Sequence, residues 1–99
     1  MASWSLLTKH ARVLLCIARN PNVRLRDIAT ALDITERSAY SIVGDLADEG
    51  YLLKEKEGRR NHYVVQRHLT LPEPAIRERT VGEVLDVFLE EKARPRRSA

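Results

Sequence analysis

Several features that mark common protein classes are scarce in this sequence. It has one cysteine, Cys16, so no internal disulfide can form and an oxidising compartment gains no support. No apolar run approaches the roughly 18 residues that a membrane-spanning helix needs. The first seven residues lack the basic and apolar regions of a secretory signal. These absences predict a soluble cytoplasmic protein with no membrane partner.

Motifs of catalysis and of cofactor or metal binding are also missing. The three histidines are scattered, and none lies beside a nucleophile at a recognised spacing. There is no glycine-rich phosphate loop and no Cys/His cluster with the spacing of a zinc site. Cys16 lies next to a predicted buried stripe, which favours packing over the alternative of a redox switch. The sequence therefore predicts no enzyme, no cofactor and no metal. It indicates no small-molecule effector, although a pocket between the last and first helices is left open.

The sequence does contain enough apolar residues for one small domain. The 99 residues are 43% hydrophobic and 31% charged, with a net charge of +3. This length supports a single domain, and the mixed signs of charge argue against wholesale disorder. The small positive excess permits a polyanionic partner without demonstrating one.

Four stretches carry the i, i+3, i+4, i+7 spacing of an amphipathic helix. Thr8 is the predicted N-cap of the first, and Asn20-Pro21-Asn22 ends it. Thr35 is predicted to cap the third, and Gly50 to end it. A capping box formed by Thr80 and Glu83 begins the fourth. The four stripes are Ala11, Leu14, Leu15 and Ala18; Leu25, Ile28, Ala29 and Leu32; Ala39, Ile42, Val43 and Leu46; and Val81, Val84, Leu85 and Phe88.

A tight turn and a hairpin complete the pattern. Only Asp33 and Ile34 separate the second stripe from Thr35, and so short a connection makes two helices cross steeply. Asp33 can adopt the left-handed conformation of such a turn, though glycine would do so at lower cost. After Gly50 the period changes, and residues 51–56 and 62–65 are predicted strands around a basic turn at 57–61.

In this order and spacing, about residues 8–66 resemble the winged helix-turn-helix domain of MarR- and ArsR-like transcription regulators. The resemblance rests on residues 25–32, 34–39, 46–52 and 58–63. It implies a mainly α fold, in which a three-helix core carries a small β-hairpin wing, here with an added C-terminal helix. Asp33 stands where glycine is common, and the third helix lacks the cysteine-rich motif of metal-sensing ArsR-like regulators. The predicted organisation is a winged helix-turn-helix domain at 1–68, a proline-containing linker at 69–74, a C-terminal dimerisation helix at 75–92 and a disordered basic tail at 93–99.

The resemblance implies a specific use of the third helix and the hairpin. The helix would enter the major groove with its N-terminal end, and the wing would follow the backbone or enter a minor groove. Arg37 can pair with guanine and Glu36 can accept from cytosine. The candidate DNA contacts are Thr35, Glu36, Arg37, Ser38, Tyr40 and Ser41 in the helix, Lys54, Lys56, Arg59, Arg60, Asn61 and His62 in the wing, and Arg24 and Arg26 at the backbone.

The fourth stripe is wide for a helix appended to a small domain, because Leu89 lies beside it. In the resembling families terminal helices often pair two subunits, which would place two third helices about one helical turn apart on DNA. The alternative is a monomer in which this helix folds back on the first. The predicted dimer interface comprises Trp4, Leu7, Val81, Val84, Leu85, Phe88 and Leu89.

We therefore predict sequence-specific binding of double-stranded DNA by a homodimeric transcriptional regulator. Regulators of the resembling families often act as repressors, so the resemblance implies a repressor that blocks polymerase access. Two alternatives stay open at this stage. The acids of the third helix suit a winged-helix protein-docking module. Arg37 could also pair with Asp33 or Glu36 and merely stabilise the start of the helix. The other alternative is a nucleic-acid-binding protein of low specificity.

Overall fold

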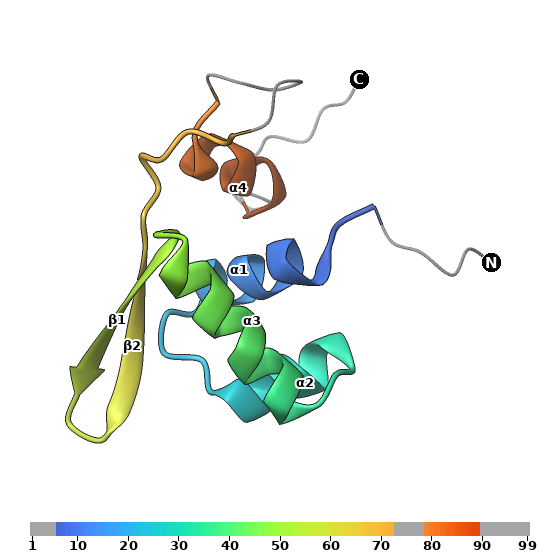
Figure 1. Ribbon diagram of the computed structural model, residues 1–99, viewed down its shortest axis with the longest axis vertical. Coiled ribbons are helices and arrows are strands. Elements are labelled where there is room, and N and C mark those ends of the chain that lie inside the picture. The colour runs from blue at the N-terminus through green and yellow to red at the C-terminus, as the bar shows by residue number, and fades with distance from the viewer. Residues whose placement is uncertain (1–5, 73–78, 90–99) are drawn as a thin grey trace, which may run out of the picture. The chain divides into compact units, whose positions relative to one another are not determined.

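The predicted mainly α winged helix-turn-helix fold is confirmed. The computed structural model describes residues 6–72 and 79–89, except for the side chain of Arg60 (Figure 1). The chain divides into two compact units, Met1–Gln66 and Arg67–Ala99. The first unit contains α1 (Lys9–Arg19), α2 (Leu25–Leu32), α3 (Glu36–Asp48), β1 (Leu52–Glu57) and β2 (Arg60–Val65), and the second contains α4 (Val81–Leu89).

The core of the first unit is built from one apolar face of each of its helices. The stripe predicted for α3 is fully buried, and so is that of α2 except for half-buried Leu25. Leu52 and Tyr63 extend this core into the base of the hairpin. The buried helical residues are Val13, Leu14 and Ile17 of α1, Ile28, Ala29 and Leu32 of α2, and Ala39, Ile42, Val43 and Leu46 of α3.

The face predicted for α1 is wrong except at Leu14. The helix buries Val13 and Ile17 instead, both at 0% exposure, while the other three predicted positions are half-buried. Both sets have helical spacing, but the branched side chains fill more of the core than alanine does. Towards the N-terminus the same face continues to His10, whose Nε2 lies 2.8 Å from Asp45 Oδ2 of α3. Because His10 is polar, the apolar spacing of this face is hard to detect in the sequence.

The predicted N-caps of α1 and α3 are confirmed. The Thr8 hydroxyl oxygen accepts from the Ala11 backbone N–H at 3.1 Å. The Thr35 hydroxyl oxygen accepts from the Ser38 backbone N–H at 3.0 Å. Each cap satisfies one of the N–H groups that have no partner within the first helical turn. Thr35 therefore fixes the residue at which α3 begins.

The turn between α2 and α3 has the left-handed residue predicted for it. Asp33 adopts φ 59° and ψ 50° and is the single non-glycine residue with positive φ in the described part of the chain. The Ile34 N–H donates to the Ala29 carbonyl at 3.0 Å, which closes the end of α2. Gly50, with φ 87°, ends α3 in the same way, as predicted.

Asp33→Gly is expected to stabilise the fold by about 0.5–1 kcal/mol, because glycine has no Cβ to crowd the left-handed conformation. Asp33→Ala is expected to destabilise it by about 1 kcal/mol. A change of 1 kcal/mol moves Tm by about 4–8 °C in a domain of this size, so thermal unfolding followed by circular dichroism resolves both variants. A lower Tm for Asp33→Gly than for the native chain would contradict the left-handed turn.

The hairpin is longer, and its loop shorter, than predicted. Strand pairing continues to Glu57 opposite Arg60, so only Gly58 and Arg59 remain in the loop. Gly58 has φ 67°, which suits the first central position of a type II′ turn. The polar composition of 57–61 predicted a five-residue turn, but one well-placed glycine lets Glu57 and Asn61 join the ladder.

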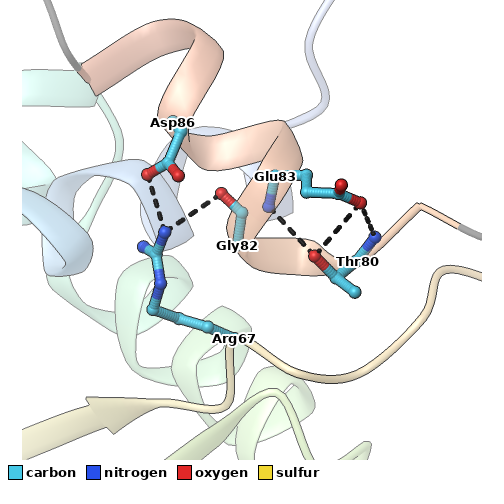
Figure 2. Close-up of polar contacts among 5 residues, drawn as sticks. All are labelled: Arg67, Thr80, Gly82, Glu83 and Asp86. Atoms are coloured by element: carbon cyan, nitrogen blue, oxygen red, sulfur yellow. Dashed lines mark hydrogen bonds and ion pairs between the residues drawn. The ribbon is translucent and has the colours of Figure 1, made fainter.

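The start of α4 in the second unit is a capping box, as predicted. The Glu83 N–H donates to the Thr80 hydroxyl at 3.1 Å, and the Thr80 N–H donates to Glu83 Oε1 at 2.9 Å (Figure 2). The helix therefore begins at Val81, within the range 75–92 predicted for it. Residues 90–92, the predicted tail at 93–99 and Trp4 lie outside the described residues.

Arg67 fastens α4 to the segment that precedes it. Its Nη2 donates to the Gly82 carbonyl at 3.2 Å and to Asp86 Oδ1 at 2.6 Å (Figure 2). A Cβ on Gly82 would lie 3.0 Å from the Arg67 Cβ and Nε, so glycine admits this close crossing. The backbone of residues 69–71, within the predicted linker, pairs with that of 79–81, and Thr70 is bridged to Thr80.

The Glu83 carboxyl should titrate below its ordinary pKa of about 4.3. The Thr80 backbone N–H holds this pKa down, and the charge of Arg79 adds to the effect. Because the folded pKa is lowered, the contribution of Glu83 to stability is present above the ordinary pKa. It is lost as pH falls through the lowered one. A 13C NMR titration of Glu83 in the folded chain and in urea measures the difference; equal values would contradict the cap.

Candidate nucleic-acid interface

The first turns of α3 present polar side chains to solvent. The buried stripe of α3 faces the core, and all six predicted contacts of the helix are exposed. Tyr40 is 63% exposed, an unusual position for a large aromatic side chain in a small domain. The oxygen of Thr35 is already engaged as the N-cap. Besides Glu36, the exposed side chains at the start of α3 that remain available to a ligand are Arg37, Ser38, Tyr40 and Ser41.

Apart from Glu36 in the first turn, the acids of α3 and of its C-terminal cap lie towards the other end of the helix. Asp45 pairs with His10, and Asp48 and Glu49 are at and just beyond the last helical residue. At 1.5 Å per residue, Arg37 and Asp45 are separated by about 12 Å along the axis. This exceeds the screening length of about 8 Å at physiological ionic strength. The acids therefore weaken anion binding at the start of α3 only slightly.

A groove with a volume of about 510 Å³ joins three of the predicted groups of residues. Its walls come from the loop before α2, the starts of α2 and α3, and the tip of the hairpin. Among the side chains that the structure describes, three arginines line it against a single carboxylate, that of Glu36. The predicted contacts that it brings together are Arg24, Arg26, Glu36, Arg59 and Asn61. None of the other predicted contacts whose side chains the structure describes lines this groove.

The wing carries its lysines on the face that continues into the core. Side chains alternate between the two faces of a strand, so Lys54 and Lys56 share the face of buried Leu52. In the hairpin register Lys54 lies opposite Tyr63, and Lys56 lies opposite Asn61. Because Tyr63 and Asn61 also line the groove, the lysines extend its positive side along the wing.

The acids of the wing fall on the opposite face. Glu55 and Glu57 alternate with the two lysines along β1, and both are exposed. Arg60 lies opposite Glu57 in the register. In β1 the lysines thus share one face and the glutamates the other, a separation that composition alone does not reveal.

Tyr63 forms an uncharged part of the groove. Burial raises the pKa of its hydroxyl, and a side-chain hydrogen bond with Asn61 opposes part of that rise. A raised pKa keeps the phenol protonated at neutral pH. Tyr63 therefore adds no negative charge beside Arg59.

His62, a predicted DNA contact, has a partner within the protein. The residue is half-buried, and its Nδ1 lies 2.8 Å from Asn22 Oδ1. The adjacent Tyr63 N–H donates to the Pro21 carbonyl at 3.0 Å. Sequence reasoning missed Asn22 because the two partners are 40 residues apart. A half-buried polar residue that pairs across such a separation leaves no local pattern.

The predicted dimer interface is only partly exposed. Phe88 is 45% exposed, whereas Val81 and Leu85 are 2% and 4% exposed. Val87, outside the predicted stripe, is 72% exposed. Leu7, Val84 and Leu89 are half-buried. The apolar surface of α4 therefore centres on Val87 and Phe88.

Cys16 fits a packing role. It is half-buried, and burial raises the pKa of its thiol although Arg12 and Arg19 act in the opposite direction. A raised pKa leaves little of the reactive thiolate at neutral pH. Within residues 6–72 and 79–89, no group of three or more His, Cys, Asp or Glu residues is placed to hold a metal ion. In the same ranges no helix is long and apolar enough to cross a bilayer.

Comparison with known families identifies the first unit. The IclR helix-turn-helix domain matches residues 6–56, just over half of the chain, from before α1 almost to the end of β1. No curated protein matches the chain. A helix-turn-helix regulator is thereby confirmed, whereas the finer resemblance to MarR and ArsR regulators is not, since the matching family is IclR. The chain belongs to the family of IclR helix-turn-helix domains, which bind DNA in transcription regulation.

Proposed function

We propose that the chain reads a specific sequence of double-stranded DNA. The start of α3 lies in the major groove, and the hairpin wing lies against the neighbouring backbone and minor groove. The observation that carries this proposal is the arginine-lined groove between α2, α3 and the wing. It gathers residues from three separate segments into one positive surface beside the exposed end of the helix.

The groove lies where one strand of the DNA backbone would run. A major groove and the next minor groove are separated by a sugar–phosphate strand, so a helix in one and a wing in the other leave a channel for that strand. Arg24, Arg26 and Arg59 supply charged donors along the channel. Contacts of this kind fix the protein on the duplex, and sequence is read by other residues.

Base reading falls to the exposed side chains of α3. Arg37 can donate two hydrogen bonds to guanine O6 and N7. Glu36 lies where the groove meets the start of α3 and can accept from cytosine N4. Tyr40 and Ser41 follow on the exposed surface of the helix. Within the described part of the chain no hydrogen bond or ion pair engages these side chains, so they are available to bases.

The proposed regulator acts as a homodimer that represses by occlusion in the cytoplasm. Val87 and Phe88 support an association role for α4, because a pair of large exposed apolar side chains on one helix suits a protein interface. Two copies would present two α3 helices to successive turns of one duplex face. A bound dimer would then block polymerase access.

Fluorescence anisotropy with a labelled duplex, titrated with salt, tests the proposal. Binding should weaken steeply as salt rises, with a slope of about −0.9 in log K against log[salt] for each phosphate contact. A selected operator should bind more tightly than random duplex at every salt concentration. Absence of binding at low salt would reject DNA binding by this face and favour the protein-docking alternative. Equal affinity for both duplexes would reject sequence specificity but would leave DNA binding by this face in place.

A further inference from the structure

We propose that His62 and Asn22 form a clamp that positions the wing, and that His62 is not itself a DNA contact. The consequence for DNA affinity rests on the proposed function, while the effect on the wing does not. The clamp joins β2 to the loop between α1 and α2. The two segments carry opposite walls of the arginine-lined groove.

Two adjacent bonds attach β2 to this loop. The Nδ1–H of His62 donates to Asn22 Oδ1 at 2.8 Å, and the Tyr63 backbone N–H donates to the Pro21 carbonyl at 3.0 Å. Asn22 is itself held in place, because its N–H donates to Asn20 Oδ1 at 3.1 Å. The loop backbone that carries the acceptor of the clamp therefore has a hydrogen bond of its own.

The wing needs such an attachment. It is a two-stranded sheet, and an isolated hairpin of two strands is marginal in water. Residues 53–59 and Asn61, in the outer part of the hairpin, are exposed, so the core does not hold its tip. Asn61 and Arg59 lie one and three residues before His62, and Arg24 lies two residues after Asn22. Loss of the clamp would therefore let the two walls of the groove move apart.

The chemistry of the imidazole limits a direct contact of His62 with a phosphate. Asn22 Oδ1 can only accept a hydrogen bond, so the proton of the neutral ring must be on Nδ1. Nε2 then has a lone pair and no proton. A neutral His62 in this tautomer has no hydrogen-bond donor left for a phosphate oxygen.

Two isosteric substitutions separate the roles. Asparagine places its side-chain nitrogen where histidine has Nδ1, whereas glutamine places it where histidine has Nε2. If His62 is a clamp, His62→Asn should keep DNA affinity within about twofold of the native chain, and His62→Gln should lose about fivefold. If His62 instead contacts DNA through Nε2, the order reverses, and that result would overturn the proposal.

A double-mutant cycle tests the partner. Asn22→Ala should weaken DNA binding as much as His62→Gln does, and the double variant should be no weaker than either single variant. Additive losses would mean that the two residues act separately, which would contradict the clamp. Arg37→Ala, which leaves the His62–Asn22 pair intact and lies on α3 rather than on the wing, is the control and should add to either variant.

The mobility of the wing can be measured without DNA, so the clamp can be tested separately from the proposed DNA binding. The {1H}–15N NOE of the amides of residues 58–61 should fall in His62→Gln and Asn22→Ala, and should stay native in His62→Asn, since only the first two loosen the wing. Unchanged NOE values in all three variants would reject the clamp whether or not the chain binds DNA. Absence of DNA binding by the native chain, with the expected NOE changes, would reject the proposed function and leave the clamp standing.

Discussion

Replacing Lys54, Lys56 and Arg59 together by alanine is expected to lower affinity for duplex DNA on the order of 100-fold at 0.1 M salt. The lysines share the groove-side face of the wing, and Arg59 lines the groove itself. Each phosphate contact that is lost should flatten the slope of log K against log[salt] by about 0.9. All three side chains are exposed, so the fold should be retained. Anisotropy titrations at four or five salt concentrations measure both quantities.

Lys9→Ala is the charge control for this experiment. Lys9 precedes His10, which pairs with Asp45 near the far end of α3, so it lies away from the groove. Its removal should leave the salt slope nearly unchanged. If Lys9→Ala flattens the slope as much per charge as the triple substitution does, the wing contributes only general electrostatic attraction and no defined phosphate contacts.

Arg37→Ala is expected to remove most of the preference for a selected operator over random duplex. A bidentate contact to guanine is worth about 1–3 kcal/mol of discrimination, which corresponds to about 5- to 150-fold. Arg37 is exposed in the first turn of α3 and does not line the groove, which suits a base contact better than a backbone contact. Competition binding with operator and random duplexes measures the ratio of affinities.

Arg37→Lys separates base reading from charge. Lysine keeps the positive charge but lacks the planar fork of guanidinium, so it should preserve affinity for random DNA and still lose discrimination. If both duplexes weaken equally in Arg37→Ala and recover equally in Arg37→Lys, Arg37 contacts a phosphate. Glu36, Tyr40 and Ser41 would then be left to read the sequence.

The helices that position the interface could be predicted because local signals agreed there. In α3 the apolar spacing, Thr35 at the start and Gly50 after the end all point to the same helix. In α1 two helical faces that share Leu14 compete, and only packing in the folded chain decides between them. Local patterns therefore identified the element, while tertiary contacts fixed which face it buries.

The candidate site divides in the same way. Exposure of the polar residues at the start of α3 follows from subtracting the buried stripe, which the sequence shows. The groove depends on the loop before α2 meeting the hairpin, and Asn22 and His62 are 40 residues apart in the chain. Pairing over that distance is set by the register of the hairpin and by the core beneath it. Glu57 and Asn61 are an example: the polar composition of their segment favours a turn, yet both residues pair in the hairpin ladder.

A 1H–15N correlation spectrum of the chain, titrated with duplex DNA at low salt, locates the DNA-binding surface residue by residue. We expect the largest shift changes at residues 35–41, at the cap and start of α3, at 54–61 of the wing and at Arg24 and Arg26. His10 and residues 45–51, at the far end of α3, should change little. Shift changes concentrated at that acidic end, or none anywhere, would contradict DNA recognition by the groove and the start of α3.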